Sequence, residues 1–148
     1  MTVDHSVTGD LRVTVESAAD PADVQRVIDG LRAFNVAHIG EPHQEAVHVF
    51  LRDASGAVVG GVIGEIKWKW LYIAKLWVDE SLRGKGSGSA LMDAAEQRAR
   101  DRGCTNAYLD TFEYQARPFY EKRGYVLFGT LEGYPPGYRQ YFLSKSLI

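Results

Sequence analysis

Residues Leu71–Leu91 read LYIAKLWVDESLRGKGSGSAL and fall into three parts. Leu71–Val78 is an apolar run interrupted by one lysine, and such a run predicts a strand buried on both faces. Gly84, Gly86 and Gly88 follow, and a helical pattern begins directly after them. Glycines let the backbone approach a ligand, and a helix N-terminus presents unpaired N–H groups and the positive end of its dipole. The stretch therefore predicts a strand, an anion-binding loop and a helix.

The spacing within the loop narrows the kind of phosphate ligand. A Walker loop requires four residues between its first glycine and a Gly-Lys-Ser/Thr ending, and a dinucleotide fingerprint requires a third glycine where Ser89 stands. The loop matches neither pattern. In this loop, two residues separate Arg83 from Gly86, and one residue separates Gly86 from Gly88. An ordinary basic surface loop is the alternative interpretation, and the loop alone does not decide between the two.

The composition fits a single globular domain. The chain has 148 residues, of which 45% are hydrophobic, and this is enough to bury a sizeable core. The net charge of −2 argues against a broad nucleic-acid surface. A single cysteine, Cys104, cannot form an internal disulfide and fits a reducing compartment. With no signal-peptide pattern and no apolar stretch near the ~20 residues of a membrane span, we expect a cytoplasmic protein without nucleic-acid or membrane partners.

Hydrophobic periodicity and turn residues predict the remaining elements. Residues 1–10 are polar and are expected to form a tail, and one domain is expected over residues 11–148. Within that domain the patterns predict strands over 11–15, 46–53, 57–66, 71–78, 106–112, 125–131 and 139–144. They predict helices from residue 21 to near 40, from the end of the glycine loop at 88 to 103, and over 116–123. The short turn 54–56 predicts an antiparallel hairpin, and the helix between strands 71–78 and 106–112 makes that pair parallel.

The helix after the glycine loop has a predicted inner and outer face. The inner face is expected to carry Leu91, Ala94, Ala95, Arg98 and Ala99. Asp93, Glu96, Gln97 and Arg100 are expected to face outward, with Glu96 and Arg100 spaced for an ion pair.

Two segments together resemble those of the GNAT superfamily of N-acetyltransferases. The spacing from Arg83 to Gly88 resembles the family's pyrophosphate loop, and residues 116–125, ARPFYEKRGY, are similar to its alanine, tyrosine and basic-x-glycine-aromatic segment. The order of elements over about residues 11–146 also looks like that of the family. The resemblance implies an α/β fold with a mixed, mostly antiparallel sheet flanked by helices and one splayed parallel strand pair. It also implies acetyl-coenzyme A as co-substrate and no metal.

Carried over by position, the resemblance implies a set of site residues. The pyrophosphate would be held, mostly by backbone N–H groups, by Arg83, Gly84, Lys85, Gly86, Ser87, Gly88 and Ser89. Leu76, Trp77 and Val78 would pair with the pantetheine arm, and Tyr120 would be the general acid beside the coenzyme sulfur. Glu113 stands where the family often has asparagine, which puts that contact to the coenzyme in doubt.

The general base stays open, because the central strand lacks the glutamate that many members of the family use there. Glu65 is the candidate base, since it lies next to the central strand in a setting that could raise its pKa. The other possibilities are a water molecule or the side chains of His43, Asp79, Glu80, Asp110 and Glu113.

The leading hypothesis is direct transfer of an acetyl group from acetyl-coenzyme A to a primary amine of a small molecule. Modification of a protein lysine or N-terminus is the alternative among enzymes, and a non-catalytic acyl-coenzyme A sensor is the alternative outside them. Aromatic residues are dense around the segments that would flank the acceptor, namely Trp68, Trp70, Tyr72, Trp77, Tyr134, Tyr138 and Tyr141. Core packing or dimer contact is one interpretation of them; any that are exposed favour an amine with an apolar or aromatic body. The resemblance also makes a homodimer a possible assembly.

Overall fold

The computed structural model describes residues 3–6 and 9–148, and it separates into two compact units, residues 1–41 and 42–148. In the first unit, β1 (Val3–Ser6) pairs antiparallel with β2 (Arg12–Val15), and α1 (Pro21–Ile39) follows. Asp20 caps α1 by accepting a hydrogen bond from the Ala22 N–H. The predicted tail is wrong for residues 3–6, which form β1, while residues 1–2 and 7–8 of that tail lie outside the described residues.

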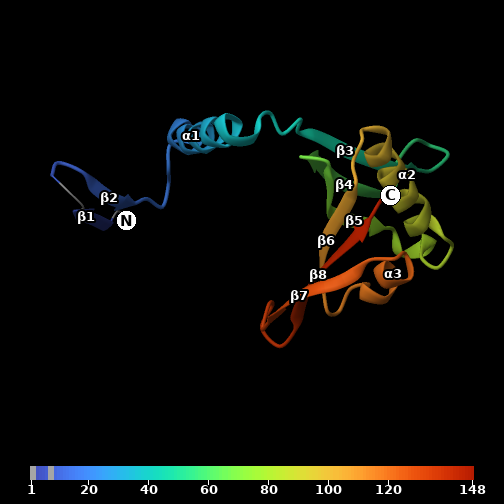
Figure 1. The fold of residues 1–148 in the computed structure, drawn as a ribbon. Coiled ribbons are helices and arrows are strands. Elements are labelled where there is room, and N and C mark those ends of the chain that lie inside the picture. The colour runs from blue at the N-terminus through green and yellow to red at the C-terminus, as the bar shows by residue number, and fades with distance from the viewer. Residues whose placement is uncertain (1–2, 7–8) are drawn as a thin grey trace. The chain divides into compact units, whose positions relative to one another are not determined.

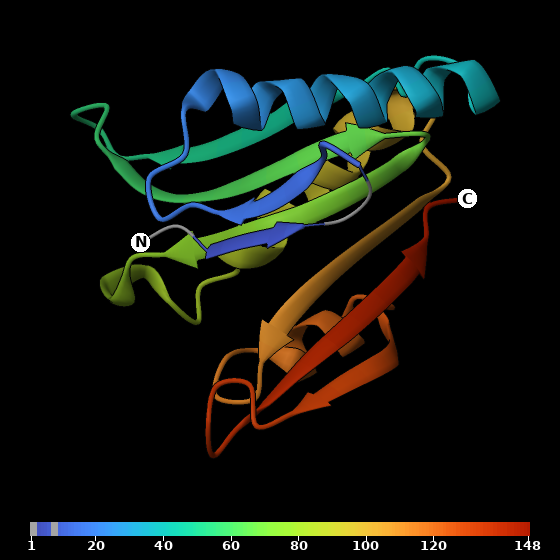
Figure 2. The ribbon, with the colours of Figure 1, turned by 90° about the vertical axis from the view of Figure 1, so that its left-hand side faces the viewer.

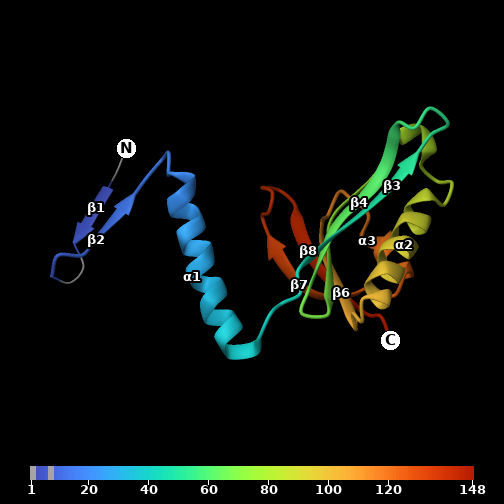
Figure 3. The ribbon, with the colours of Figure 1, turned by 90° about the horizontal axis from the view of Figure 1, so that it is seen from above.

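The second unit is a six-stranded mixed sheet in the order β3-β4-β5-β6-β8-β7, shown in Figure 2. Its strands are β3 (Glu45–Arg52), β4 (Val58–Lys67), β5 (Trp70–Val78), β6 (Asn106–Phe112), β7 (Val126–Glu132) and β8 (Arg139–Ser146). A 3-10 helix, η1 (Glu80–Leu82), precedes α2 (Ser87–Asp101), and α3 (Arg117–Lys122) follows β6. Both α-helices of this unit lie on the same face of the sheet (Figure 3). These elements confirm the predicted order, with ends shifted by one or two residues.

The predicted pairings are also confirmed. β3 and β4 form the antiparallel hairpin, and β5 and β6 form the sheet's parallel pair. The parallel pairing runs from Trp70 opposite Asn106 to Ile73 opposite Leu109 and stops there, so the two strands separate beyond these residues.

A β-bulge at Ala74 lies where the parallel strands separate. On β4, Ile63 pairs with Lys75 and Gly64 pairs with Ile73, which leaves Ala74 without a partner on that strand. A bulge bends its strand and increases the local twist. The bulge therefore turns the second half of β5 away from β6 and opens the sheet from within.

The bulge also changes which residues of β5 face the core. Leu71 and Ile73 are buried before it, whereas Leu76 and Val78 pack against the core after it. Within residues 42–148, the expectation that this strand is buried on both faces is wrong. The opposite face carries the half-buried Tyr72, because side chains alternate along a strand and only one face meets α2.

The core of this unit lies between the sheet and the two helices. Its most buried side chains include Leu71, Met92, Leu109, Tyr125 and Leu143. In the described part of the chain, no helix is long and apolar enough to cross a membrane.

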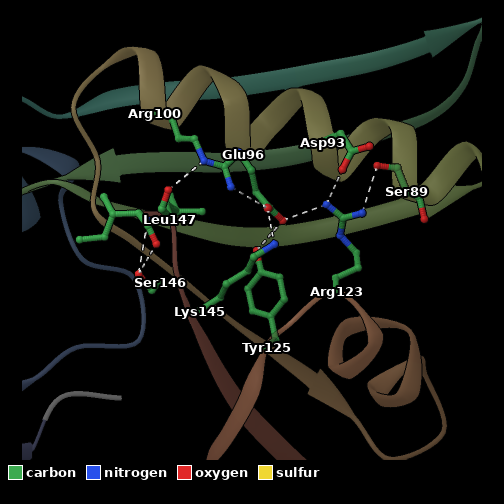
Figure 4. Close-up of polar contacts among 10 residues, drawn as sticks. Ser89, Asp93, Glu96, Arg100, Arg123, Tyr125, Lys145, Ser146 and Leu147 are labelled. Atoms are coloured by element: carbon green, nitrogen blue, oxygen red, sulfur yellow. Dashed lines mark hydrogen bonds and ion pairs between the residues drawn. The ribbon is translucent and has the colours of Figure 1, made fainter.

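Glu96 of α2 is buried, with 1% of its surface exposed, so the prediction that it faces outward is wrong. Its carboxylate is 2.6 Å from Lys145 Nζ and 3.1 Å from Arg123 Nη2, and it accepts a hydrogen bond of 3.1 Å from the Tyr125 hydroxyl (Figure 4). Arg100 Nη2 lies 3.8 Å away, as its spacing predicted. Glu96 can be buried because two cations, Arg123 at the end of α3 and Lys145 of β8, pair with its carboxylate in the interior of this unit.

The buried inner face of α2 consists of Leu91, Met92, Ala95, Glu96 and Ala99. The expected inner residues Ala94 and Arg98 are exposed instead. The helix is rotated so that Glu96 can enter the cation cluster, and a single helical pattern with several alanines did not fix that rotation.

Candidate functional site

A cavity of about 940 Å³ follows the open side of β5 from the bulge to the glycine loop and α3. This volume lies near the upper end of the range for small-molecule and cofactor sites. Its wall comes from four segments, which are the second half of β5, the loop and first turn of α2, the end of β6, and the start of α3. The lining residues are Ile73, Ala74, Lys75, Leu76, Trp77, Val78, Leu82, Arg83, Gly84, Gly86, Ser87, Gly88, Ser89, Asp110, Thr111, Gln115, Ala116, Phe119 and Tyr120.

The glycine loop has a backbone that only glycine adopts easily. Gly84 has φ of 77° and Gly86 has φ of 84°, both in the left-handed region. Gly86 is the N-cap of α2, so the free N–H groups of that helix's first turn lie at the cavity wall. A positive helix end beside backbone glycines suits an anion such as pyrophosphate.

Two basic side chains of the loop differ in their placement. Arg83 lines the cavity, and its Nε donates a hydrogen bond of 3.1 Å to the Val78 carbonyl, which ties the loop back to β5. Lys85 is exposed and is not part of the cavity wall, although the resemblance placed it among the pyrophosphate residues.

The second half of β5 offers the cavity an unpaired strand edge. Leu76, Trp77 and Val78 lie beyond the last pair with β6, and all three line the cavity. The backbone groups of Leu76 and Trp77 on this edge are therefore available to a ligand that carries amides, whereas the Val78 carbonyl already accepts the hydrogen bond from Arg83. Strand-like pairing of an extended ligand with an exposed sheet edge is a common mode of recognition.

Tyr120 of α3 closes the end of the cavity near the bulge. It is 7% exposed and packs edge-on against Phe119 and Tyr125. Burial, together with the nearby Asp110 carboxylate, raises the pKa of Tyr120 to about 12. The hydroxyl therefore keeps its proton at neutral pH and can act as a proton donor, but not as a base.

Asp110 is the carboxylate that lies at the cavity where β5 and β6 separate. It is the first residue of β6 beyond the paired region. Its two carboxylate oxygens accept hydrogen bonds from the Tyr72 hydroxyl at 2.6 Å and from Gln140 Nε2 at 2.8 Å. Each oxygen keeps a further lone pair, so the group can still accept a proton or bind an amine.

Glu65, the candidate base from sequence, lines a second and smaller cavity of about 320 Å³. This cavity is formed by Glu65, Lys67, Trp68, Trp70, Tyr72 and Tyr108. Tyr72 connects the two sites, because its ring lines the small cavity while its hydroxyl bonds to Asp110 in the large one. The structure thus separates two carboxylates that the sequence could not rank.

Two of the other carboxylates considered as bases, Asp79 and Glu113, have structural partners. Asp79 caps η1, and hydrogen bonds from the side chain and N–H of Ser81 lower its pKa, which makes it a weak base. Glu113 accepts hydrogen bonds from Arg139 and from the Tyr141 hydroxyl, each at 3.1 Å.

Cys104 is buried in the core, and burial raises the pKa of its thiol, which suits a packing role and not that of a nucleophile. Among the residues that the structure describes, no group of three or more His, Cys, Asp or Glu side chains is arranged to hold a metal ion.

The cavity combines three features. It has a parallel strand pair that separates at a bulge, a glycine loop with a helix N-terminus, and a buried tyrosine. Together these features define an acyl-coenzyme A N-acyltransferase fold. Residues 16–125 match the Acetyltransferase (GNAT) family, and the chain belongs to that family. It is therefore an acetyltransferase of the GNAT type.

Individual relatives support this assignment. The chain is 42% identical over 93 residues to the blasticidin-S acetyltransferase of Streptomyces morookaense, covering 62% of this chain and 68% of that protein. It is similar to the crystal structure of an acetyltransferase from Bacillus cereus, with a TM-score of 0.82 and 31% identity over 89% of this chain and 96% of that one. The fold also resembles a protein of Bacillus anthracis, assigned as a streptothricin acetyltransferase and crystallised with acetyl-coenzyme A. For that protein the TM-score is 0.61 and the identity 22%, over 68% of this chain and 62% of that one.

Proposed function

We propose that this enzyme transfers an acetyl group from acetyl-coenzyme A to a primary amine of a small molecule by direct attack. The observation that carries the proposal is the single cavity of about 940 Å³, because it joins an anion-binding loop, an unpaired strand edge and a buried tyrosine. These three features match, in order, the pyrophosphate, the amide-containing arm and the thioester of acetyl-coenzyme A. The chain's similarity to an acetyltransferase of blasticidin-S supports a small-molecule acceptor.

Acetyl-coenzyme A supplies the acetyl group as a thioester. In the proposed reaction, the nitrogen of a neutral amine bonds to the acetyl carbon as the carbon–sulfur bond breaks. Asp110 accepts the proton that the amine nitrogen loses, and the Tyr120 hydroxyl gives a proton to the departing sulfur. The free backbone groups of β5 near the bulge lie at the same end of the cavity and would orient the acetyl group.

The reaction is tested by a thiol-release assay with acetyl-coenzyme A against a panel of small primary amines and a lysine-containing peptide. We expect thiol release with at least one small amine and little with the peptide. Release with the peptide alone would support the protein-modifying alternative. Coenzyme binding without release for any acceptor would support the non-catalytic sensor. A cytoplasmic location and a homodimer stay predictions from the sequence.

Tyr120→Phe is expected to lower kcat by about a hundredfold, which is the lower end of the range for general acid catalysis. The ring and its packing stay, so the melting temperature and the affinity for coenzyme should change little. Because the pKa of Tyr120 is about 12, the hydroxyl stays protonated up to pH 10. Deprotonation of Tyr120 should therefore not lower the wild-type kcat as the pH rises to 10.

The measurements are steady-state kinetics and thermal melting, with Tyr134→Phe as control, since Tyr134 is 53% exposed and lies outside the cavity wall. A lower melting temperature at nearly full kcat would show that the Tyr120 hydroxyl is structural and would remove it from the mechanism.

Asp110→Asn is expected to lower kcat by about a hundredfold with every acceptor, because the amide keeps the shape of the side chain but cannot accept the proton. Glu65→Gln should lower kcat by less than about tenfold, since Glu65 lies in the other cavity. The opposite order of the two losses would restore Glu65 as the base. The comparison uses saturating amine, so that kcat is measured separately from binding.

A further inference from the structure

The small cavity has a wall of aromatic rings that come together only through the strand register. Glu65 of β4 pairs with Tyr72 of β5, and Tyr72 pairs with Tyr108 of β6, so these side chains lie side by side on one face of the sheet. The rings of Tyr72 and Tyr108 stack with centroids 4.7 Å apart, and Trp70 contacts Tyr108 edge-on at 6.0 Å. The faces of such rings attract cations.

Within residues 42–148, the carboxylate beside these rings has no cationic partner. Glu65 is half-buried and accepts a hydrogen bond of 2.9 Å from Gln44 Nε2, and it makes no ion pair with another residue of this unit. Lys67, the cation of this cavity, lies instead over the Trp68 ring, with Nζ 5.0 Å from the ring centroid. Burial and the charges of Glu65 and Asp110 raise the pKa of Tyr108, which reflects a negative field in this region. A carboxylate next to aromatic faces is suited to an ammonium or guanidinium group.

Trp68 provides a second and independent sign of a ligand. Its indole Nε1 is buried and has no hydrogen-bond partner within residues 42–148, and Trp68 lines this cavity. Trp68 and Lys69 form the turn between β4 and β5 with φ of 47° and 65°, a left-handed conformation that costs about 1–2 kcal/mol per residue without glycine. Strain of this kind is concentrated at functional sites. An oxygen of a bound molecule would satisfy the indole N–H.

The position of the cavity connects it to the reacting groups. Tyr72 forms part of its wall and donates a hydrogen bond to Asp110, which lines the large cavity beside Tyr120. A molecule held against the rings therefore lies next to the carboxylate that would receive the amine proton. Its volume of about 320 Å³ is at the low end of the range for small-molecule sites.

We propose that the small cavity binds the amine acceptor, and that the acceptor carries a second, permanently charged ammonium or guanidinium group besides the amine that is acetylated. This inference rests on the proposed function and narrows its substrate class to small dications. Glu65 and the faces of Tyr72 and Tyr108 hold the charged group, and the reactive amine extends through the gap between β5 and β6 toward Asp110.

The test uses two acceptors with the same amine and the same chain, 4-aminobutylguanidine and its uncharged counterpart 4-aminobutylurea. With wild-type enzyme and acetyl-coenzyme A, kcat/KM should be tenfold to a hundredfold higher for the guanidine, mainly through a lower KM. Glu65→Gln should reduce this preference to about threefold or less, because it raises KM for the guanidine far more than for the urea compound. Tyr108→Leu should also reduce the preference, because it removes the stacked ring.

Asp101→Asn is the matched control, since it removes one carboxylate at the exposed end of α2 and should keep the full preference. Equal kcat/KM for the two compounds with the wild-type enzyme would overturn the inference while leaving the acetyltransferase function intact. An equal fall in kcat for both compounds in Glu65→Gln would also overturn it, because Glu65 would then act in the chemistry. If acetyl-coenzyme A gives no thermal stabilisation and no amine releases thiol, the proposed function itself fails.

Discussion

Replacing Gly86 with glutamate is expected to abolish the thermal stabilisation of this protein by acetyl-coenzyme A. A ligand present at a hundred times its dissociation constant stabilises the folded state by about 2.7 kcal/mol, and the variant should lose all of it. Gly86 is the N-cap of α2 and lines the cavity, so the new side chain would put bulk and negative charge at the proposed pyrophosphate site. Thermal melting with and without acetyl-coenzyme A measures the effect.

The control for this prediction is Gly56→Glu in the turn between β3 and β4. Gly56 has φ of 87°, against 84° for Gly86, and neither glycine has an atom within 4 Å of an added Cβ. The two variants therefore carry the same backbone strain and the same new charge, and they differ in the contact with the cavity. Gly56→Glu should melt at a lower temperature but keep the full shift. Equal shifts in both variants would show that the coenzyme does not bind at the loop.

Removal of the buried Glu96 carboxylate is expected to be the most destabilising single change. Glu96→Ala removes the buried anion shared by Arg123 and Lys145 and leaves Arg123 with the exposed Asp93 alone, while the Arg123 and Lys145 side chains are only 12% and 18% exposed. Breaking a buried ion pair by removing one partner costs about 3–5 kcal/mol. Since each kcal/mol shifts Tm by about 2–4 °C at this size, the melting temperature should fall by about 6–20 °C.

Asp93→Ala is the matched control for this change. Asp93 binds the same Arg123 guanidinium at 2.7 Å, but its side chain is 71% exposed. Such a pair contributes about 1 kcal/mol or less, so this variant should melt within a few degrees of the wild type. Chemical denaturation of both variants gives the free energies of unfolding. Similar losses in the two variants would contradict the idea that burial makes the Glu96 cluster important.

The Glu96 cluster also connects the fold to the site. Arg123 follows α3, directly after the turn that carries Tyr120, and it binds Glu96 and Asp93 of α2. Its Nη1 also donates a hydrogen bond of 3.4 Å to the Ser89 carbonyl in the first turn of α2. Arg123 therefore ties the end of α3 to the first turns of α2 (Figure 4), and both of these segments contribute to the wall of the large cavity.

The bulge of β5 is visible in the burial of its residues and not in their apolar content. Core-facing residues of β5 occupy positions 71 and 73 before the bulge and 76 and 78 after it. A regular strand cannot place both pairs on one face, because its side chains alternate with a period of two. One extra residue between Ile73 and Leu76 resolves the conflict, and this marks the point where the strands separate.

The sequence by itself determined the elements, their order, the parallel pair and the glycine loop, because these depend on local periodicity, turn residues and spacing. It also determined the position of Tyr120 relative to Gly124, through a segment that is continuous in the chain. Only the tertiary structure decided that Glu96 is buried, that Asp110 lies at the separation of β5 and β6, and that Glu65 stands beside stacked rings. Each of these depends on partners that are distant in sequence, with Glu96 and Arg123 separated by 27 positions and Tyr72 and Asp110 by 38. Such neighbours are set by strand register and helix rotation, which no local pattern in this chain encodes.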